Sequence, residues 1–343
     1  MQTNLMEETT EMTKTIMQLE AREAPARILQ QLQENRNLMA ELGAQIRQFN
    51  PQLVMTVGRG SSDHAGVFAK YLVGIEAGRP AASAMPSIAG LYGRRQNLSK
   101  ALVIVISQSG RSPDILAQAE MAKQAGAFCV ALVNDETSPL RDIVDAVVPL
   151  KAGPEKAVAA TKSFLTTLSA IIHLVAEWTK NAELLEALTH LPLYLEKAID
   201  SPAQLTPEDF KGVDDCVVLA RGLGYGIARE IALKLKEVCG IHAESFSSAE
   251  FLHGPVTLVE TKLTILDVLV KDEAEAAHVE QIEDMKRRGA DLVHLNQVMA
   301  DVHPRLAPLL LLQRFYLDVE KIALARGVNP DAPPGLNKVT RTR

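Results

Sequence analysis

The sequence predicts an α/β protein with two parallel sheets, each covered by helices on both faces. Short, continuously apolar runs alternate with helical patterns along most of the chain, as in parallel sheets whose strands are buried on both sides. An apolar run that ends in a glycine turn begins near residue 53 and again near residue 214, about 160 residues later. This recurrence predicts an internal duplication, in which the second unit repeats the architecture of the first.

Composition narrows the class of protein further. The chain has 343 residues, enough for two such units, and its 47% hydrophobic and 23% charged residues are ordinary for a soluble globular protein. Aromatic residues make up 4% and the net charge is −6, which disfavours both base stacking and attraction to nucleic acid or an anionic membrane. We therefore expect a small-molecule partner, and neither nucleic acid nor membrane.

The cysteines and the amino-terminal residues bear on localisation. Cys129, Cys216 and Cys239 are far apart in apolar contexts, which predicts buried thiols in a reducing compartment. The start of the chain is polar and mixed in charge, unlike a signal peptide, and no apolar run is long enough to span a membrane. These features predict a cytoplasmic protein.

Four segments are predicted along the chain. Residues 1–48 form a helical arm whose apolar stripe is interrupted near Pro25. The stripe consists of Ile16, Leu19, Ile28, Leu29 and Leu32. Residues 49–200 form the first unit and residues 212–330 the second, with a polar boundary between them. Residues 331–343 form a Pro-rich tail, whose composition alone is typical of a disordered segment.

The elements of each unit follow from its apolar runs. In the first unit we expect strands that begin at residues 53 and 101, strands at 127–133 and 146–150, and a long helix at 156–180. In the second unit we expect strands at 217–220, 263–270 and 291–295, and a last helix at 306–326. Between them, Ile227, Ile231, Leu235 and Val238 recur at helical spacing, and Gly240 ends that helix in the position of a left-handed cap.

The most informative local signal is the loop from Ser107 to Ser112, which reads Ser-Gln-Ser-Gly-Arg-Ser. It follows a buried strand and opens a helix, the place where open α/β sheets bind ligands. Hydroxyls, a glycine and free backbone N–H groups at a helix N-terminus favour an anion such as phosphate. The corresponding place in the second unit, Val270 to Glu273, carries two acids and no serine. The sequence therefore predicts one phosphate site per chain.

The sequence lacks the other common nucleotide-binding and metal-binding motifs. The loop Gly58-Arg59-Gly60-Ser61-Ser62 lacks the third glycine and the later acidic residue of a dinucleotide fingerprint. There is no GxxxxGK[ST] sequence, no HExxH, and no paired Cys/His spacing of a metal site. We expect no nicotinamide, no metal and no other cofactor.

A second candidate site lies on the helix that Gly240 ends. Lys234 and Glu237 are three residues apart and share a face of that helix. A carboxylate and an amine near a helix end, followed by a Ser-rich loop and His253, suit proton transfer on a small substrate. The helix alone favours the plainer alternative, an exposed ion pair on a solvated face. For His253, a structural role and presentation to a cavity remain equally open.

Taken together, the chain resembles the tandem sugar-isomerase (SIS) proteins, above all the isomerase half of glucosamine-6-phosphate synthase and its stand-alone relatives. The resemblance covers roughly residues 20–343 and rests on the motifs GSSDHAG, SQSGRSPD, VAATKSF, ALKLKEVCGIHAES, AEFLHGP and LNKVT. It implies two doubly wound (flavodoxin-like) SIS subdomains, a sugar phosphate substrate, and a homodimer with active sites shared between subunits. It also implies that the tail folds over the site.

The resemblance assigns residues to roles. For substrate binding it implies a phosphate cradle of Ser107, Gln108, Ser109 and Ser112, and two hydroxyls that contact the sugar phosphate, Ser61 and Ser62. For catalysis it implies Glu237 as the carboxylate that moves the proton between C1 and C2, with Lys234 one turn earlier. It implies His253, from the partner subunit, for ring opening, and Lys338 for a Schiff base with the open ketose.

Two departures leave the exact sugar open. The family lines the sugar with a Val-Ala-Ser stretch and with an Ala beside the lysine, where this chain has Val158, Ala160 and Asn337. No amidotransferase domain precedes residue 1, so we expect ammonia release and not net synthesis. The expected activity is that of a glucosamine-6-phosphate deaminase. The alternatives are a fructosamine-6-phosphate deglycase, a galactosamine-6-phosphate deaminase or isomerase, and a non-catalytic sugar-phosphate sensor.

Overall fold

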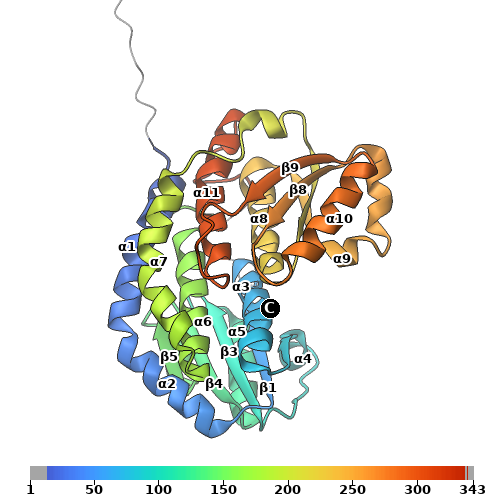
Figure 1. Cartoon of the computed structure of the whole chain (residues 1–343). Coiled ribbons are helices and arrows are strands. Elements are labelled where there is room, and N and C mark those ends of the chain that lie inside the picture. The colour runs from blue at the N-terminus through green and yellow to red at the C-terminus, as the bar shows by residue number, and fades with distance from the viewer. Residues whose placement is uncertain (1–13, 337, 339–343) are drawn as a thin grey trace, which may run out of the picture.

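The computed structural model describes residues 14–336 and 338, and it contains two parallel sheets (Figure 1). The first sheet has the order β2-β1-β3-β4-β5 and the second the order β7-β6-β8-β9. In both, the first strand in sequence lies between the second and the third, and every pair is parallel. The strands are β1 (Leu53–Val57), β2 (Ala81–Ser83), β3 (Ala101–Ser107), β4 (Phe128–Val133), β5 (Ala146–Pro149), β6 (Asp215–Ala220), β7 (His242–Ser247), β8 (Thr264–Leu269) and β9 (Asp291–Asn296). The predicted α/β class and the duplication are confirmed.

Helices cover the sheets and connect them. They are α1 (Ile16–Glu34), α2 (Arg36–Phe49), α3 (Ser61–Ala77), α4 (Ser87–Gly90), α5 (Pro113–Gln124), α6 (Lys162–Thr179), α7 (Ala182–Asp200), α8 (Leu223–Cys239), α9 (Ser248–Phe251), α10 (Glu275–Arg287) and α11 (Ala307–Ala325). Three short 3₁₀ helices span Pro139–Asp142, Pro207–Phe210 and Pro255–Thr261. Figure 1 shows α1, α7 and α11 packed side by side along one edge of the molecule. Among the described helices, none is long and apolar enough to cross a membrane.

The apolar runs become strands that are buried on both faces. Along β3, Val103 and Val105 pack with α5, whereas Leu102 and Ile104 belong to the core on the opposite face, with α3 and α6. The two-residue period of a strand produces this division, because successive side chains point to opposite faces. A continuously apolar strand is therefore what this position requires. The three predicted thiols, Cys129, Cys216 and Cys239, are likewise buried.

The structure of the amino-terminal arm differs from the prediction in two ways. Pro25 lies inside α1, and the helix continues to Glu34. A proline has no N–H for the carbonyl four residues earlier, here Ala21. Gln313 of α11 replaces that donor, with its Nε2 3.0 Å from the Ala21 oxygen. The buried face of α1 also differs from the predicted stripe: Met17, Ala21, Ala24 and Ile28 are buried, whereas Ile16, Leu19 and Leu29 are exposed.

Because Gln313 supplies the hydrogen-bond donor that Pro25 lacks, its removal has a testable effect on stability. Gln313→Met is expected to lower the free energy of unfolding by about 1–3 kcal/mol, because it leaves the buried Ala21 carbonyl without a donor. In a Pro25→Ala background the loss should be smaller, since the new N–H of residue 25 can donate to the same carbonyl. Urea denaturation of the four proteins measures the coupling. Equal losses in both backgrounds would contradict this account.

Two further segments differ from the prediction. The Ser-rich segment after Gly240 is not a loop but the edge strand β7, which pairs with β6 and buries Ala243. Its exposed polar residues interrupt the continuous apolar run by which the other strands were predicted. The long helix begins at Lys162 and not at residue 156. The residues before it form a loop, because two buried carboxylates, Glu20 and Glu155, accept their backbone N–H groups.

Candidate active site

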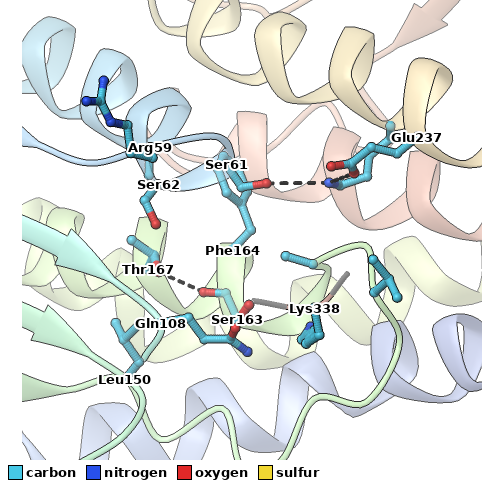
Figure 2. A pocket seen from close by; sticks show the side chains of 14 residues that line it. Arg59, Ser61, Ser62, Gln108, Leu150, Ser163, Phe164, Thr167, Glu237 and Lys338 are labelled. Carbon is cyan, nitrogen blue, oxygen red and sulfur yellow. Dashed lines mark hydrogen bonds and ion pairs between the residues drawn. The ribbon is translucent and has the colours of Figure 1, made fainter. Parts of the chain in front are cut away.

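Two adjoining cavities lie beyond the carboxyl ends of β1 and β3, where the two units meet, and Figure 2 shows the residues that line the larger one. The larger has a volume of about 190 Å³ and the smaller about 160 Å³. Arg59, Ser62, Gln108 and Lys338 line both. The larger cavity also contains the predicted residues Ser61, Val158, Ala160, Lys234 and Glu237, and the smaller contains Ser107, Ser109 and Ser112. The fold thus brings together residues from loops that are far apart in sequence.

The loop Ser107–Ser112 is held in shape by its own hydrogen bonds. The backbone N–H of Gly110 donates to Ser107 Oγ at 3.0 Å, and Ser138 Oγ donates to the Gly110 carbonyl at 2.9 Å. Gly110 has φ +59°, and a Cβ there would lie 2.0 Å from Ser138 Oγ, so only glycine fits. Ser112 caps α5 without a side-chain cap bond. Its hydroxyl is therefore available at the N-terminus of a 12-residue helix, where an anion is stabilised.

Close packing of α3 on α8 places a buried charge cluster beside the larger cavity. A Cβ at Gly226 would lie 2.9 Å from Phe68, so glycine permits this approach of the helices. Glu230, which is fully buried, accepts hydrogen bonds from Ser61 Oγ at 3.0 Å and contacts His64 Nδ1 at 3.0 Å. Its other partner is Lys234 Nζ at 3.1 Å.

Lys234 connects this cluster to Glu237. Its Nζ lies 2.5 Å from Glu237 Oε2 and 3.4 Å from Ser61 Oγ. The Lys234 side chain is 1% exposed and that of Glu237 is 22% exposed, so the pair is not the solvated surface pair that the helix alone favoured. Both residues line the larger cavity, and Glu237 is the more exposed of the two.

Burial and neighbouring charges shift the pKa values in this cluster in opposite directions, and the charges have the larger effect. Burial by itself would raise the pKa of Glu230, but the Lys234 ammonium and the His64 ring outweigh it and hold that pKa below its ordinary value. Burial would also lower the pKa of Lys234, but Glu230 and Glu237 reverse the effect and raise it. In this cluster one ammonium group, that of Lys234, therefore forms ion pairs with two carboxylates, those of Glu230 and Glu237.

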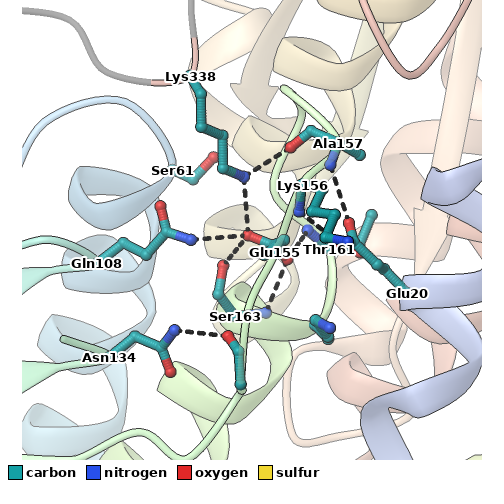
Figure 3. Close-up of polar contacts among 12 residues, drawn as sticks. Glu20, Ser61, Gln108, Asn134, Glu155, Lys156, Ala157, Thr161, Ser163 and Lys338 are labelled. Carbon is teal, nitrogen blue, oxygen red and sulfur yellow. Dashed lines mark hydrogen bonds and ion pairs between the residues drawn. The ribbon is translucent and has the colours of Figure 1, made fainter.

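Lys338 of the tail lines the same cavity, and Figure 3 shows its amine beside Glu155 and the Ala157 carbonyl. Its Nζ donates to the Ala157 carbonyl at 2.6 Å and to Glu155 Oε2 at 3.2 Å. The tail before it is tied down as well, because the Asp331 carbonyl accepts from the N–H of Val158 and the Asp331 carboxylate accepts from the first N–H groups of α1. Within the described part of the tail, Asp331 thus contacts the loop before α6 and the start of α1, and Lys338 lines the cavity.

Among the predicted site residues that the structure describes, His253 is the one that lines neither cavity. It is exposed in the turn after α9. Asn337 lies outside the described residues. Among residues 14–336 and 338, no group of three His, Cys, Asp or Glu side chains is arranged to hold a metal ion.

Sequence reasoning missed three charged residues at this site. Glu230 precedes Lys234 by four residues, so helical spacing contains the signal for it. Arg59 stands inside the first glycine loop, where its Nε donates to Asp114 at 2.9 Å. Glu155 had no such signal, because its partners Gln108 and Lys338 are 47 and 183 residues away in sequence.

Similarity to known proteins agrees with this arrangement. A family model described as the SIS domain matches residues 50–176 and 211–301, more than half of the chain. The chain belongs to the SIS domain family. Each matched segment of this SIS protein contains all strands of one of the two sheets, and residues from both segments line the larger cavity.

Individual SIS relatives are similar over different lengths. The glutamine–fructose-6-phosphate aminotransferase of Sulfurisphaera tokodaii is 32% identical over 306 residues, which are 84% of this chain and 50% of that protein. The chain thus spans about half the length of that curated relative. A crystal structure from Silicibacter pomeroyi, of a protein named as a phosphosugar isomerase, is 37% identical with a TM-score of 0.87, covering 93% of this chain and 100% of that one. A glucosamine-6-phosphate deaminase of Thermotoga maritima shares the fold, with 20% identity and a TM-score of 0.71 over 92% of this chain and 100% of that one.

Proposed function

We propose that this SIS protein is a phosphosugar isomerase that deaminates glucosamine 6-phosphate to fructose 6-phosphate and ammonia. The observation that carries the proposal is the cavity of about 190 Å³, which Glu237, Lys338 and Gln108 of the Ser107–Ser112 loop all line. A proton-transfer carboxylate, an amine and a hydroxyl-rich helix N-terminus are the groups that an aldose–ketose isomerisation of an amino sugar phosphate requires. The similarity to phosphosugar isomerases supports the substrate class.

Glu237 performs the proton transfer in this mechanism. Its carboxylate removes the proton from C2 of the open-chain amino sugar, and the electrons form an enolamine between C1 and C2. Glu237 then returns a proton to C1, which leaves a protonated imine at C2. The bond from Lys234 keeps Glu237 in place through both steps.

Ammonia leaves in the second half of the reaction. The amine of Lys338 adds to the C2 imine, ammonia departs, and the sugar is held as an iminium of the lysine. Water hydrolyses this C=N bond to give the ketose and the free lysine, so one water is consumed and one ammonia released. The phosphate, held at the Ser107–Ser112 loop, supplies binding energy that positions the reacting carbons.

Ammonia release tests the proposal directly. Purified protein is incubated with glucosamine 6-phosphate, and ammonia and fructose 6-phosphate are measured in parallel. Equal amounts of both products are expected. Release from galactosamine 6-phosphate alone, or glucose 6-phosphate from a fructosamine adduct, would replace the proposed substrate by one of the alternatives. Binding of these phosphosugars without any turnover would identify a sensor and refute the enzyme.

His253 gives a prediction about assembly, because it is exposed in its own chain and does not reach the cavities. If the partner subunit of a homodimer supplies this ring, Glu237→Ala and His253→Ala proteins are each inactive, whereas an equal mixture after subunit exchange regains about a quarter of the wild-type activity in its mixed dimers. Native mass spectrometry verifies that exchange took place. Mixed dimers without activity would show that His253 does not act across subunits.

A further inference from the structure

Glu155 is a buried carboxylate with an unusual number of hydrogen-bond donors around it (Figure 3). Its side chain is 0% exposed. Oε1 accepts from the backbone N–H groups of Thr161 at 2.9 Å and Ser163 at 3.1 Å. Oε2 accepts from Ser163 Oγ at 2.6 Å, Gln108 Nε2 at 3.2 Å and Lys338 Nζ at 3.2 Å. Every described partner donates, so the contacts suit an acceptor-only, ionised carboxylate.

The contacts of Glu155 fall into two groups. Some hold the carboxylate in place, and through the others the carboxylate holds residues of the cavities. The two backbone N–H groups and the Ser163 hydroxyl belong to the start of α6 and hold the carboxylate rigidly. The other two partners come from the cavities: Gln108 from the Ser107–Ser112 loop and Lys338 from the tail. One oxygen of a rigid carboxylate therefore sets the positions of an amide and an amine on opposite sides of the site.

The Lys338 amine has few other constraints. Its second contact is the Ala157 carbonyl, and the loop that carries Ala157 is anchored by Glu20, which accepts the N–H groups of Lys156 and Ala157. The Lys338 side chain is 26% exposed, so packing alone does not fix its end. The Ala157 carbonyl at 2.6 Å and the Glu155 carboxylate at 3.2 Å together fix the amine, and Glu155 is the charged partner of the two.

We propose that Glu155 is a positioning residue that presents the Lys338 amine to the electrophilic carbon, an imine or a carbonyl, of a substrate anchored by its phosphate. The amine adds to that carbon and a C=N bond to the lysine forms. Ammonia leaves when the carbon is the C2 imine of the proposed deamination, and water leaves when it is a carbonyl. Because Glu155 also holds Gln108, the same carboxylate keeps the amine in register with the phosphate loop. The inference rests on the site of the proposed function but does not depend on which sugar is deaminated.

A phosphate-bearing aldehyde that is not a substrate tests this positioning. Pyridoxal 5′-phosphate forms an imine with a suitably placed lysine, borohydride reduces the C=N bond to a stable amine, and peptide mass spectrometry locates the label. In the wild type, Lys338 is expected to be labelled, with protection by inorganic phosphate. Glu155→Gln keeps the size of the side chain but turns an NH₂ group toward donors, and it is expected to reduce Lys338 labelling by about 10- to 100-fold. Glu155→Asp, which keeps the charge on a shorter stem, serves if the glutamine variant does not fold.

The control measurements separate positioning from general damage. Inorganic phosphate affinity, measured by protection, should change by less than about threefold, whereas a purely structural role for Glu155 would weaken phosphate binding and labelling together. Glu23→Gln removes an ion pair to the nearby buried Lys162 and should leave Lys338 labelling unchanged. Unaltered labelling in both Glu155 variants, or no labelling of Lys338 in the wild type, overturns the inference. Labelling that depends on Glu155 in a protein that releases no ammonia from any amino sugar phosphate would retain the inference and refute the proposed function.

Discussion

Glu237→Gln is expected to lower kcat for ammonia release from glucosamine 6-phosphate by about 10³-fold, with KM changed by less than about threefold. An amide cannot take up the C2 proton, so the loss falls on the chemical step. Its carbonyl oxygen can still accept the bond from Lys234, so the geometry of the α8 cluster is retained. The proposed phosphate contacts belong to a different loop, so this variant is expected to leave them unchanged. Initial rates over a range of substrate concentrations separate the two parameters.

A matched control accompanies this variant. Glu244→Gln removes an exposed carboxylate on β7 and should leave both parameters unchanged. Solvent tritium incorporation into the substrate provides a second readout, because C2 proton exchange requires the base even when later steps are slow. If Glu237→Gln retains exchange and turnover, Glu237 is not the base, and the proton-transfer role must pass to another group in the cavity.

Glu230→Leu is expected to lower the free energy of unfolding by about 3–5 kcal/mol, the usual cost of removing one partner from a buried ion pair. Lys234 then keeps Glu237 as its one carboxylate partner, while His64 and Ser61 lose theirs. Lys234→Met should be similarly costly, because Glu230 is then left buried without its ammonium. The double variant Glu230→Leu/Lys234→Met should recover part of the loss, since neither charge is left unpaired. Urea denaturation at neutral pH measures all four proteins, and strictly additive losses would contradict the coupling.

The same cluster sets a pH dependence with a definite sign. Because the pKa of Glu230 is lower in the fold than in the unfolded chain, its ionisation stabilises the protein above the unfolded value of about 4.3. That contribution is lost as the pH falls through the lower, folded value. Wild type should therefore lose stability on acidification more steeply than Glu230→Leu.

The sequence was sufficient where structure follows from local patterns. The apolar run of β3, the serine loop after it and the glycine cap of α8 all depend on residues within a few positions of one another, and each was predicted correctly. Contacts across the chain were not predictable in this way. Ser61 and Glu230 are 169 residues apart, and nothing near either residue indicates the other. Near Pro25 the sequence predicted an interrupted apolar stripe, and it gave no sign of the compensating donor, Gln313, which is 292 residues away.

The core that both sheets share has a consequence for how the protein unfolds. Leu102 and Ile104 of the first sheet and Val218 and Leu266 of the second belong to one contiguous set of buried side chains, which includes α1, α3, α6, α8 and α11. Neither repeat has an interior of its own on that side, although each has a separate small core on its outer face. The two copies are therefore no longer independent modules. They form one cooperative unit that melts in a single transition, and a fragment with only the second repeat would expose the apolar face that the first one covers.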